Sequence, residues 1–132
     1  MQYEPTLSRE ELVELATQRY FANVDKKNFD AVMDCFNDTA LFTVQTAFTV
    51  HAGEEGIGRM FRDFFATYDS IRHHDFVCTV DAKHGRITAR FLAELVDTNG
   101  QKTQFENTNF WRVRNGKFEE VYVYMNNSNP LV

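Results

Sequence analysis

Apolar side chains in the first half of the chain recur every three to four residues, the spacing of one face of an α-helix. This pattern predicts a helix from Ser8, where Ser8 and Glu11 form a capping box, to about Asp25. A short second helix is predicted over residues 29–36. A third helix follows the loop "HAGEEG" and carries its apolar residues at helical spacing: Ile57, Met60, Phe61, Phe64, Phe65 and Tyr68.

The second half of the chain changes to the alternating pattern of β-strands. The earlier stretch "ALFTVQTAFTV" is also predicted to be extended, as a bent strand or a hairpin. Further strands are predicted in "HDFVCTVDA", "RITARFLAELVD", "QKTQFENTNFWRVR" and "KFEEVYVYM". The turns between them are "HG", "TNG" and "NG", of which the last is a strong type I′ signal. This order predicts an α+β fold, with N-terminal helices packed on one face of a strongly curved sheet.

Two asparagines interrupt the apolar face of the strand "FENTNFWRVR". Asn107 and Asn109 alternate in phase with Trp111, so they should point into the interior. Burying an unpartnered amide costs roughly 1–3 kcal/mol. We therefore expect both amides to face a pocket, lined also by Trp111 and, from the last strand, Val123 and Met125.

Composition and charge narrow the class of protein. The 132 residues fit one domain, residues 1–132, and the 13 Phe imply a thick apolar interior, a pocket or an interface. The net charge is −5 without a basic cluster, so neither nucleic acid nor an anionic membrane is an expected partner. No signal peptide or membrane span is visible, which predicts a cytoplasmic protein. Cys35 and Cys78 are interpreted as reduced thiols, and the four histidines lack the spacing of a metal site.

The element order and four stretches resemble the nuclear transport factor 2-like superfamily, and within it the SnoaL-like group. The stretches are "QRYFANVDKKNFDAVMDCFNDTALF", "HAGEEGIGRMFRDFF", "RHHDFV" and "NFWRVRNGKFEEVYVYM". This resemblance implies a cystatin-like cone, in which a mixed or antiparallel sheet encloses a pocket for a small hydrophobic molecule. It implies no cofactor. One fold hosts many chemistries, so the reaction has to be argued from the site.

The resemblance to ketosteroid isomerases places Tyr20 at the tyrosine of the oxyanion hole and Asn109 at its acid partner. Val44 falls on the catalytic base, and Phe61 falls on a supporting tyrosine. Because a valine cannot accept a proton, steroid-type isomerisation by that mechanism is not expected. Val44 and Phe61 are then expected to line the pocket.

The resemblance to scytalone dehydratases places Asp25 on a catalytic aspartate, His74 on a catalytic histidine and Asn107 on a substrate-binding asparagine. His74 would move protons and Asp25 would orient its ring. The two tyrosines that hold a water in those enzymes fall on Val24 and Val44, and their second histidine has no counterpart. The site is therefore half complete.

Strand alternation puts His74 on the inward face with Phe76 and Cys78, and His73 on the outward face. Plain structural roles stay open. Asp25 could be a helix-end carboxylate in water, and His74 a strand-end side chain. His51 precedes the third helix and is expected to be a loop residue, with a position at a pocket mouth as the alternative.

Three functions remain open: a dehydratase or isomerase, a non-catalytic binding domain, and a dimerisation module with a filled pocket. Proteins with this resemblance often dimerise through the outer sheet face. Here that face carries an aromatic stripe, which predicts a homodimer. Its residues are Thr108, Phe110, Tyr122 and Tyr124.

Overall fold

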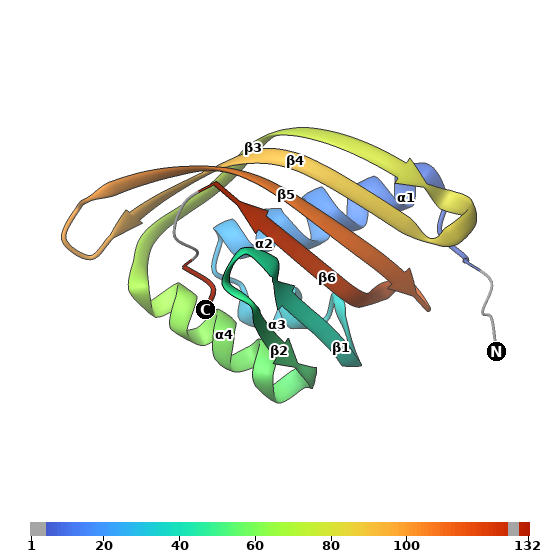
Figure 1. Cartoon of the computed structure of the whole chain (residues 1–132), viewed down its shortest axis with the longest axis horizontal. Helices are drawn as coiled ribbons and strands as arrows, with labels where there is room; N and C mark the ends of the chain where they lie inside the picture. Colours follow the sequence, from blue (N-terminus) through green and yellow to red (C-terminus); the bar gives the residue numbers. More distant parts are fainter. Residues whose placement is uncertain (1–4, 127–129) are drawn as a thin grey trace.

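A curved six-stranded sheet arches over the helices in the computed structural model, which describes residues 5–126 and 130–132 (Figure 1). The elements are α1 (Arg9–Glu14), η1 (Leu15–Phe21), α2 (Ala22–Asp25), α3 (Phe29–Met33), β1 (Phe36–Val44), η2 (Gln45–Ala47), β2 (Thr49–Ala52), α4 (Gly53–Thr67), β3 (Tyr68–Asp81), η3 (Ala82–His84), β4 (Arg86–Asp97), β5 (Lys102–Arg114) and β6 (Lys117–Met125). The α+β prediction is confirmed, and the sheet is curled without closing into a barrel.

The strands follow the order β2-β1-β6-β5-β4-β3. β3 to β6 form the predicted antiparallel meander, and β1 pairs with β6 in parallel, so the sheet is mixed. The predicted "NG" turn joins β5 to β6. Asn115 and Gly116 both have positive φ, at 53° and 77°, as a type I′ turn requires.

The N-terminal helix begins with the predicted capping box. The Glu11 N–H donates to Ser8 Oγ at 3.2 Å, and the Ser8 N–H donates to Glu11 Oε1 at 3.0 Å. The helix continues through the π-helix η1 and ends at Asp25. Tyr20 and Phe21 are adjacent in sequence and both are buried, although adjacent residues do not share a face of a regular α-helix. A π-helix is wider than an α-helix, and such segments occur often at functional sites.

Two boundaries differ from the prediction. The second helix, α3, ends at Met33, and Phe36 is already the first residue of β1, where it pairs with Phe118. The extended stretch is a hairpin of β1 and β2, and β2 includes His51. His51 is therefore a strand residue. No loop separates β2 from α4, because the strand ends at Ala52 and the helix begins at Gly53.

β3 contains a β-bulge in the middle of the segment "HHDFV". Between His74 and Val77 the strand advances three residues, while its partner β4 advances two, from Leu92 to Arg90. Asp75 is the extra residue and has φ of +59°. An inserted residue reverses the alternation of a strand on one side of the insertion. The side chain that faces inward before Phe76 is therefore His73 and not His74.

The concave side of the sheet packs against the helices and forms one apolar core. Cys35 and Cys78 are free thiols, and burial raises the pKa of Cys35 to about 11. None of the helices within residues 5–126 combines the length and apolar character that crossing a bilayer requires. The same described part of the chain contains no cluster of three or more His, Cys, Asp or Glu that could hold a metal ion.

Candidate functional site

A cavity lies between the concave side of the sheet and the helices. Most of its wall is aromatic or aliphatic. Four polar side chains also reach it: Tyr20 from η1, His73 from β3, and Asn107 and Asn109 from β5. An apolar cavity with a few convergent polar groups is the usual form of a small-molecule site.

The cavity is narrow in this conformation. Its empty volume is about 410 Å³ when its open rim is included, but the centre of a water molecule can occupy only about 20 Å³ of it. The volume open to the centre of a water molecule determines what can bind without rearrangement, and it is enough for roughly one water molecule. Pro130 and Leu131 form part of the wall. A larger ligand therefore requires side chains or this segment to move.

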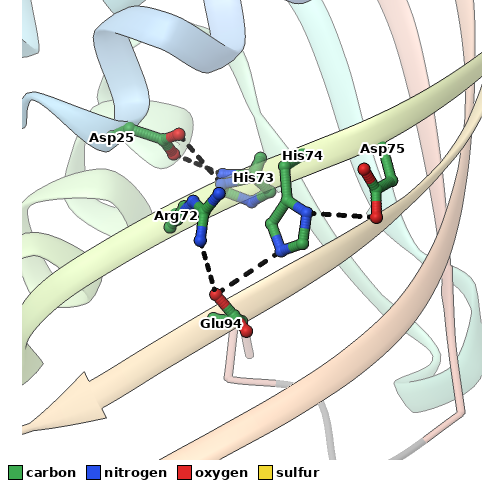
Figure 2. A network of polar contacts seen from close by, with 6 residues as sticks. All are labelled: Asp25, Arg72, His73, His74, Asp75 and Glu94. Carbon is green, nitrogen blue, oxygen red and sulfur yellow. Dashed lines mark hydrogen bonds and ion pairs between the residues drawn. The ribbon is translucent and has the colours of Figure 1, made fainter.

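His73 and Asp25 form a two-point contact beside the cavity (Figure 2). The His73 backbone N–H donates to Asp25 Oδ2 at 2.9 Å, and His73 Nδ1 lies 2.5 Å from Asp25 Oδ1. The side chains are 7% and 23% exposed, respectively. Phe21 packs against the imidazole with ring centroids 4.4 Å apart. The ring is therefore fixed by a carboxylate at one nitrogen and by an aromatic face.

His74, the predicted partner of Asp25, lies elsewhere, and that prediction is wrong. Its Nδ1 is 3.3 Å from Asp75 Oδ2, and its Nε2 is 3.4 Å from Glu94 Oε2 (Figure 2). His74 is absent from the cavity wall. The prediction that His73 is exposed is wrong for the same reason, because the bulge at Asp75 exchanges the two orientations.

Asn107 and Asn109 are buried and line the cavity, as their position in the strand predicts. The side-chain oxygen Oδ1 of each lacks a hydrogen-bond partner within the described part of the chain. A buried amide oxygen without a partner is costly, and a ligand or an ordered water would relieve that cost. The two amides are the clearest sign that the cavity takes a polar group.

The remaining predicted pocket residues divide into two groups. Phe61, Val123 and Met125 line the cavity together with Tyr20. Val44 and Trp111 are buried in the core but are not part of the cavity wall.

Tyr20 lies at the centre of an aromatic cluster. Its ring is 6.1 Å from that of Phe61 and 5.4 Å from that of Phe118, both edge to face. Burial raises the pKa of its hydroxyl well above the ordinary value, and the charges of Cys35 and Asp25 act in the same direction. The hydroxyl therefore stays protonated near neutral pH, where it can donate a hydrogen bond.

The outer sheet face carries the predicted aromatic stripe. Phe110 and Tyr124 are 46% and 41% exposed, and their ring centroids are 6.1 Å apart. Thr108 and Tyr122 pair with them across β5 and β6 and are half-buried. A homodimer through this face stays a prediction.

Sequence reasoning missed several residues of the site. Phe21 was missed because a π-helix does not follow the α-helical period. His73 was missed because the bulge interrupts the alternation of β3. Asp75 was a possible signal of that bulge, because Asp tolerates a positive φ better than most residues. Leu131 was missed because its contact with His51 joins distant parts of the chain.

The family model described as "SnoaL-like domain" matches residues 17–121. No curated protein sequence matches the chain significantly. Three solved structures show the same fold at low sequence identity. A protein of Xanthomonas campestris pv. campestris, provisionally named a polyketide cyclase, has a TM-score of 0.78 and 19% identity over 88% of this chain and 90% of its own.

AusH from Aspergillus nidulans has a TM-score of 0.79 and 9% identity over 96% of this chain and 92% of its own. A protein of Catenulispora acidiphila with a ketosteroid isomerase-like fold, in complex with trimethylamine, has a TM-score of 0.74 and 12% identity over 84% of each chain. These identities establish the fold and no more, while the family model covers most of the sequence. The chain therefore belongs to the SnoaL-like domain family of the nuclear transport factor 2-like superfamily.

Proposed function

We propose that this protein is an acid-base enzyme, a dehydratase or isomerase, acting on a small hydrophobic molecule that carries a carbonyl or hydroxyl group. The observation behind the proposal is that His73, a residue of the cavity wall, contacts Asp25, while the amide oxygens of Asn107 and Asn109 face the same cavity without a partner among the described residues. The steps require only proton transfers, so the proposal needs no cofactor.

The carboxylate determines which nitrogen of His73 acts as the base. Ionised Asp25 can only accept hydrogen bonds, so the nitrogen that faces it, Nδ1, carries the hydrogen. In the neutral ring Nε2 then holds the lone pair and can take a proton from a substrate. Asp25 keeps this tautomer and stabilises the imidazolium that forms, which is the role of an orienting carboxylate.

The reaction can be written with balanced protons and electrons. His73 Nε2 takes a proton from the carbon next to the substrate carbonyl, and the C–H electron pair moves to the carbonyl oxygen as an enolate. Tyr20 O–H or the amide N–H groups of Asn107 and Asn109 can donate to this oxygen. In a dehydration the enolate electrons then reform the C=O bond and make a C=C bond, the C–O bond to the β-hydroxyl breaks, and that hydroxyl takes the His73 proton and departs as water. In an isomerisation of an unsaturated ketone the enolate electrons instead form a C–H bond at another carbon with the His73 proton, and the C=O bond reforms.

The wall of the cavity fits such a substrate. Phe61, Val123 and Met125 provide the apolar surface, while the amides provide the polar contact. The structural neighbour provisionally named a polyketide cyclase supports a substrate that contains carbonyl groups. Val44 stands on β1 at the position of the isomerase base and cannot accept a proton. A base from another strand, His73 on β3, is consistent with this.

The alternative is a binding domain without catalysis. The narrow free space beside Asn107 and Asn109 favours this alternative, since only about 20 Å³ is open to the centre of a water molecule. A dimerisation module with a filled cavity would have the same feature. Catalysis requires the cavity to open for a substrate, whereas a dimerisation module with a filled cavity requires no opening.

Exchange of carbon-bound hydrogen for deuterium tests the proposal without a known substrate. A panel of small ketones, linear and cyclic, is incubated with the protein in D₂O and followed by NMR. We expect His73→Gln to slow the exchange by at least about 100-fold, the usual contribution of a general base. His74→Gln is the matched control, because the neighbouring histidine faces away from the cavity, and it should keep the wild-type rate.

Equal rates for the two variants would show that His73 is not the base. Ketones that bind, detected as a rise in melting temperature, but do not exchange would favour the binding domain.

A further inference from the structure

The described segment from Pro130 to Val132 contributes to the wall of the cavity. Pro130 and Leu131 are wall residues, and Leu131 belongs to the apolar core with only 8% of its surface exposed. Val132 is 67% exposed, so the inward orientation belongs to Leu131 and not to the whole segment. Figure 1 shows this segment between the end of β6 and α4.

Leu131 accepts a hydrogen bond from His51. His51 Nε2 on β2 lies 2.7 Å from the Leu131 carbonyl oxygen. A carbonyl oxygen only accepts, so Nε2 carries the hydrogen and donates it. His51 is half-buried and packs near Phe42, with ring centroids 6.4 Å apart. The burial of the Leu131 side chain and the hydrogen bond from His51 are two independent observations.

Together they describe an occupied binding position. A branched aliphatic group lies in the apolar wall, and a carbonyl oxygen near it accepts a hydrogen bond from His51. This is the chemistry of a small aliphatic ketone or ester. The narrowness of the cavity follows in part from this occupancy, because the Leu131 side chain takes space that a ligand would need.

We infer that Leu131 is an internal plug held by His51, and that a ligand enters by displacing it and then accepts the His51 hydrogen bond itself. His51 is thus a ligand-binding residue for a carbonyl oxygen, beside the wall residue Leu131 and apart from the His73 and Asp25 pair. The inference rests on the proposed function only in taking the cavity as the ligand site.

Binding of 4-methylpentan-2-one tests the plug, because this ketone has the isobutyl group of a leucine side chain and a carbonyl oxygen. Its dissociation constant is measured by NMR titration for wild type, Leu131→Ala and the matched control Val132→Ala. We expect Leu131→Ala to bind the ketone at least tenfold more tightly than wild type, and Val132→Ala to bind as wild type does. Equal affinities for the two alanine variants, with both shown to be folded by circular dichroism, would overturn the plug.

His51→Phe provides a second test that leaves the Leu131 side chain in place. It keeps an aromatic ring but removes the donor, so the Leu131 and Val132 amides should exchange with D₂O faster than in wild type. Unchanged exchange at both amides would overturn the role of His51.

Failure of the plug and failure of the proposed function are distinguishable. The binding measurement requires no turnover and should give the same tenfold gain when Leu131→Ala is combined with His73→Gln. A gain in binding without any ketone exchange would contradict the acid-base function and leave the plug intact. Exchange that depends on His73, without a gain in binding, would contradict only the plug.

Discussion

Replacing Asp25 with asparagine should weaken the fold by a measurable amount, because Asp25 accepts two hydrogen bonds from one residue. The His73 N–H donates at 2.9 Å and its Nδ1 lies at 2.5 Å. An asparagine can accept only one of them, and its NH₂ group would face Nδ1, which can accept from it only if the ring hydrogen moves to Nε2. Hydrogen bonds to charged groups contribute about 1.5–3 kcal/mol each.

The magnitude follows from the exposure of the pair. Asp25 is 23% exposed, so its bonds should lie toward the lower end of that range. We expect Asp25→Asn to lower the free energy of unfolding by about 2 kcal/mol. With a urea dependence of about 2 kcal/mol per molar, the midpoint should move down by about 1 M.

Asp75→Asn is the matched control, since the same chemical change then falls on the neighbouring pair. Asp75 is 72% exposed beside His74, and exposed ion pairs contribute little. Asparagine also tolerates the positive φ of this position. The control should lose less than about 0.5 kcal/mol.

Urea unfolding followed by circular dichroism gives both values, and ¹⁵N NMR of His73 reports its tautomer. In the wild type the hydrogen of the neutral ring should reside on Nδ1, and Asp25→Asn should shift the population toward Nε2. A midpoint for Asp25→Asn equal to that of the control, with an unchanged tautomer, would refute the assignment of this pair.

Three further predictions follow from other parts of the structure. Ser8→Ala removes the N-cap that accepts from Glu11, so thermal unfolding should show a loss of about 1 kcal/mol, and a loss near zero would contradict a structural role for the cap. Phe110→Glu places a charge on the outer face beside Tyr124, so light scattering should show one chain where the wild type shows two; a wild type of one chain would refute the dimer prediction. The pKa of Cys35, about 11 in the fold against 9.0 for an ordinary thiol, means that the unfolded chain loses its proton first as pH rises. The free energy of unfolding should therefore fall between about pH 9 and pH 11, and Cys35→Ala should lack this part of the fall.

Much of the fold could be predicted because it depends on local patterns. The capping box at Ser8, the alternation in β4 to β6 and the turn at Asn115 and Gly116 each lie within a few neighbouring residues. The inward orientation of Asn107 and Asn109 is also local, because side chains alternate along a regular strand. These features could be predicted before any partner segment was known.

The site depended on contacts that no local pattern contains. The choice between His73 and His74 was decided by a single extra residue, Asp75, which shifts the register of β3 against β4. The contact between His51 and Leu131 joins residues far apart in sequence. Hydrophobic period and turn chemistry are local, so most elements and the polar groups of the cavity could be predicted from the residues alone. Which histidine meets Asp25, and which distant segment completes the cavity wall, depend on long-range packing and are seen only in the folded molecule.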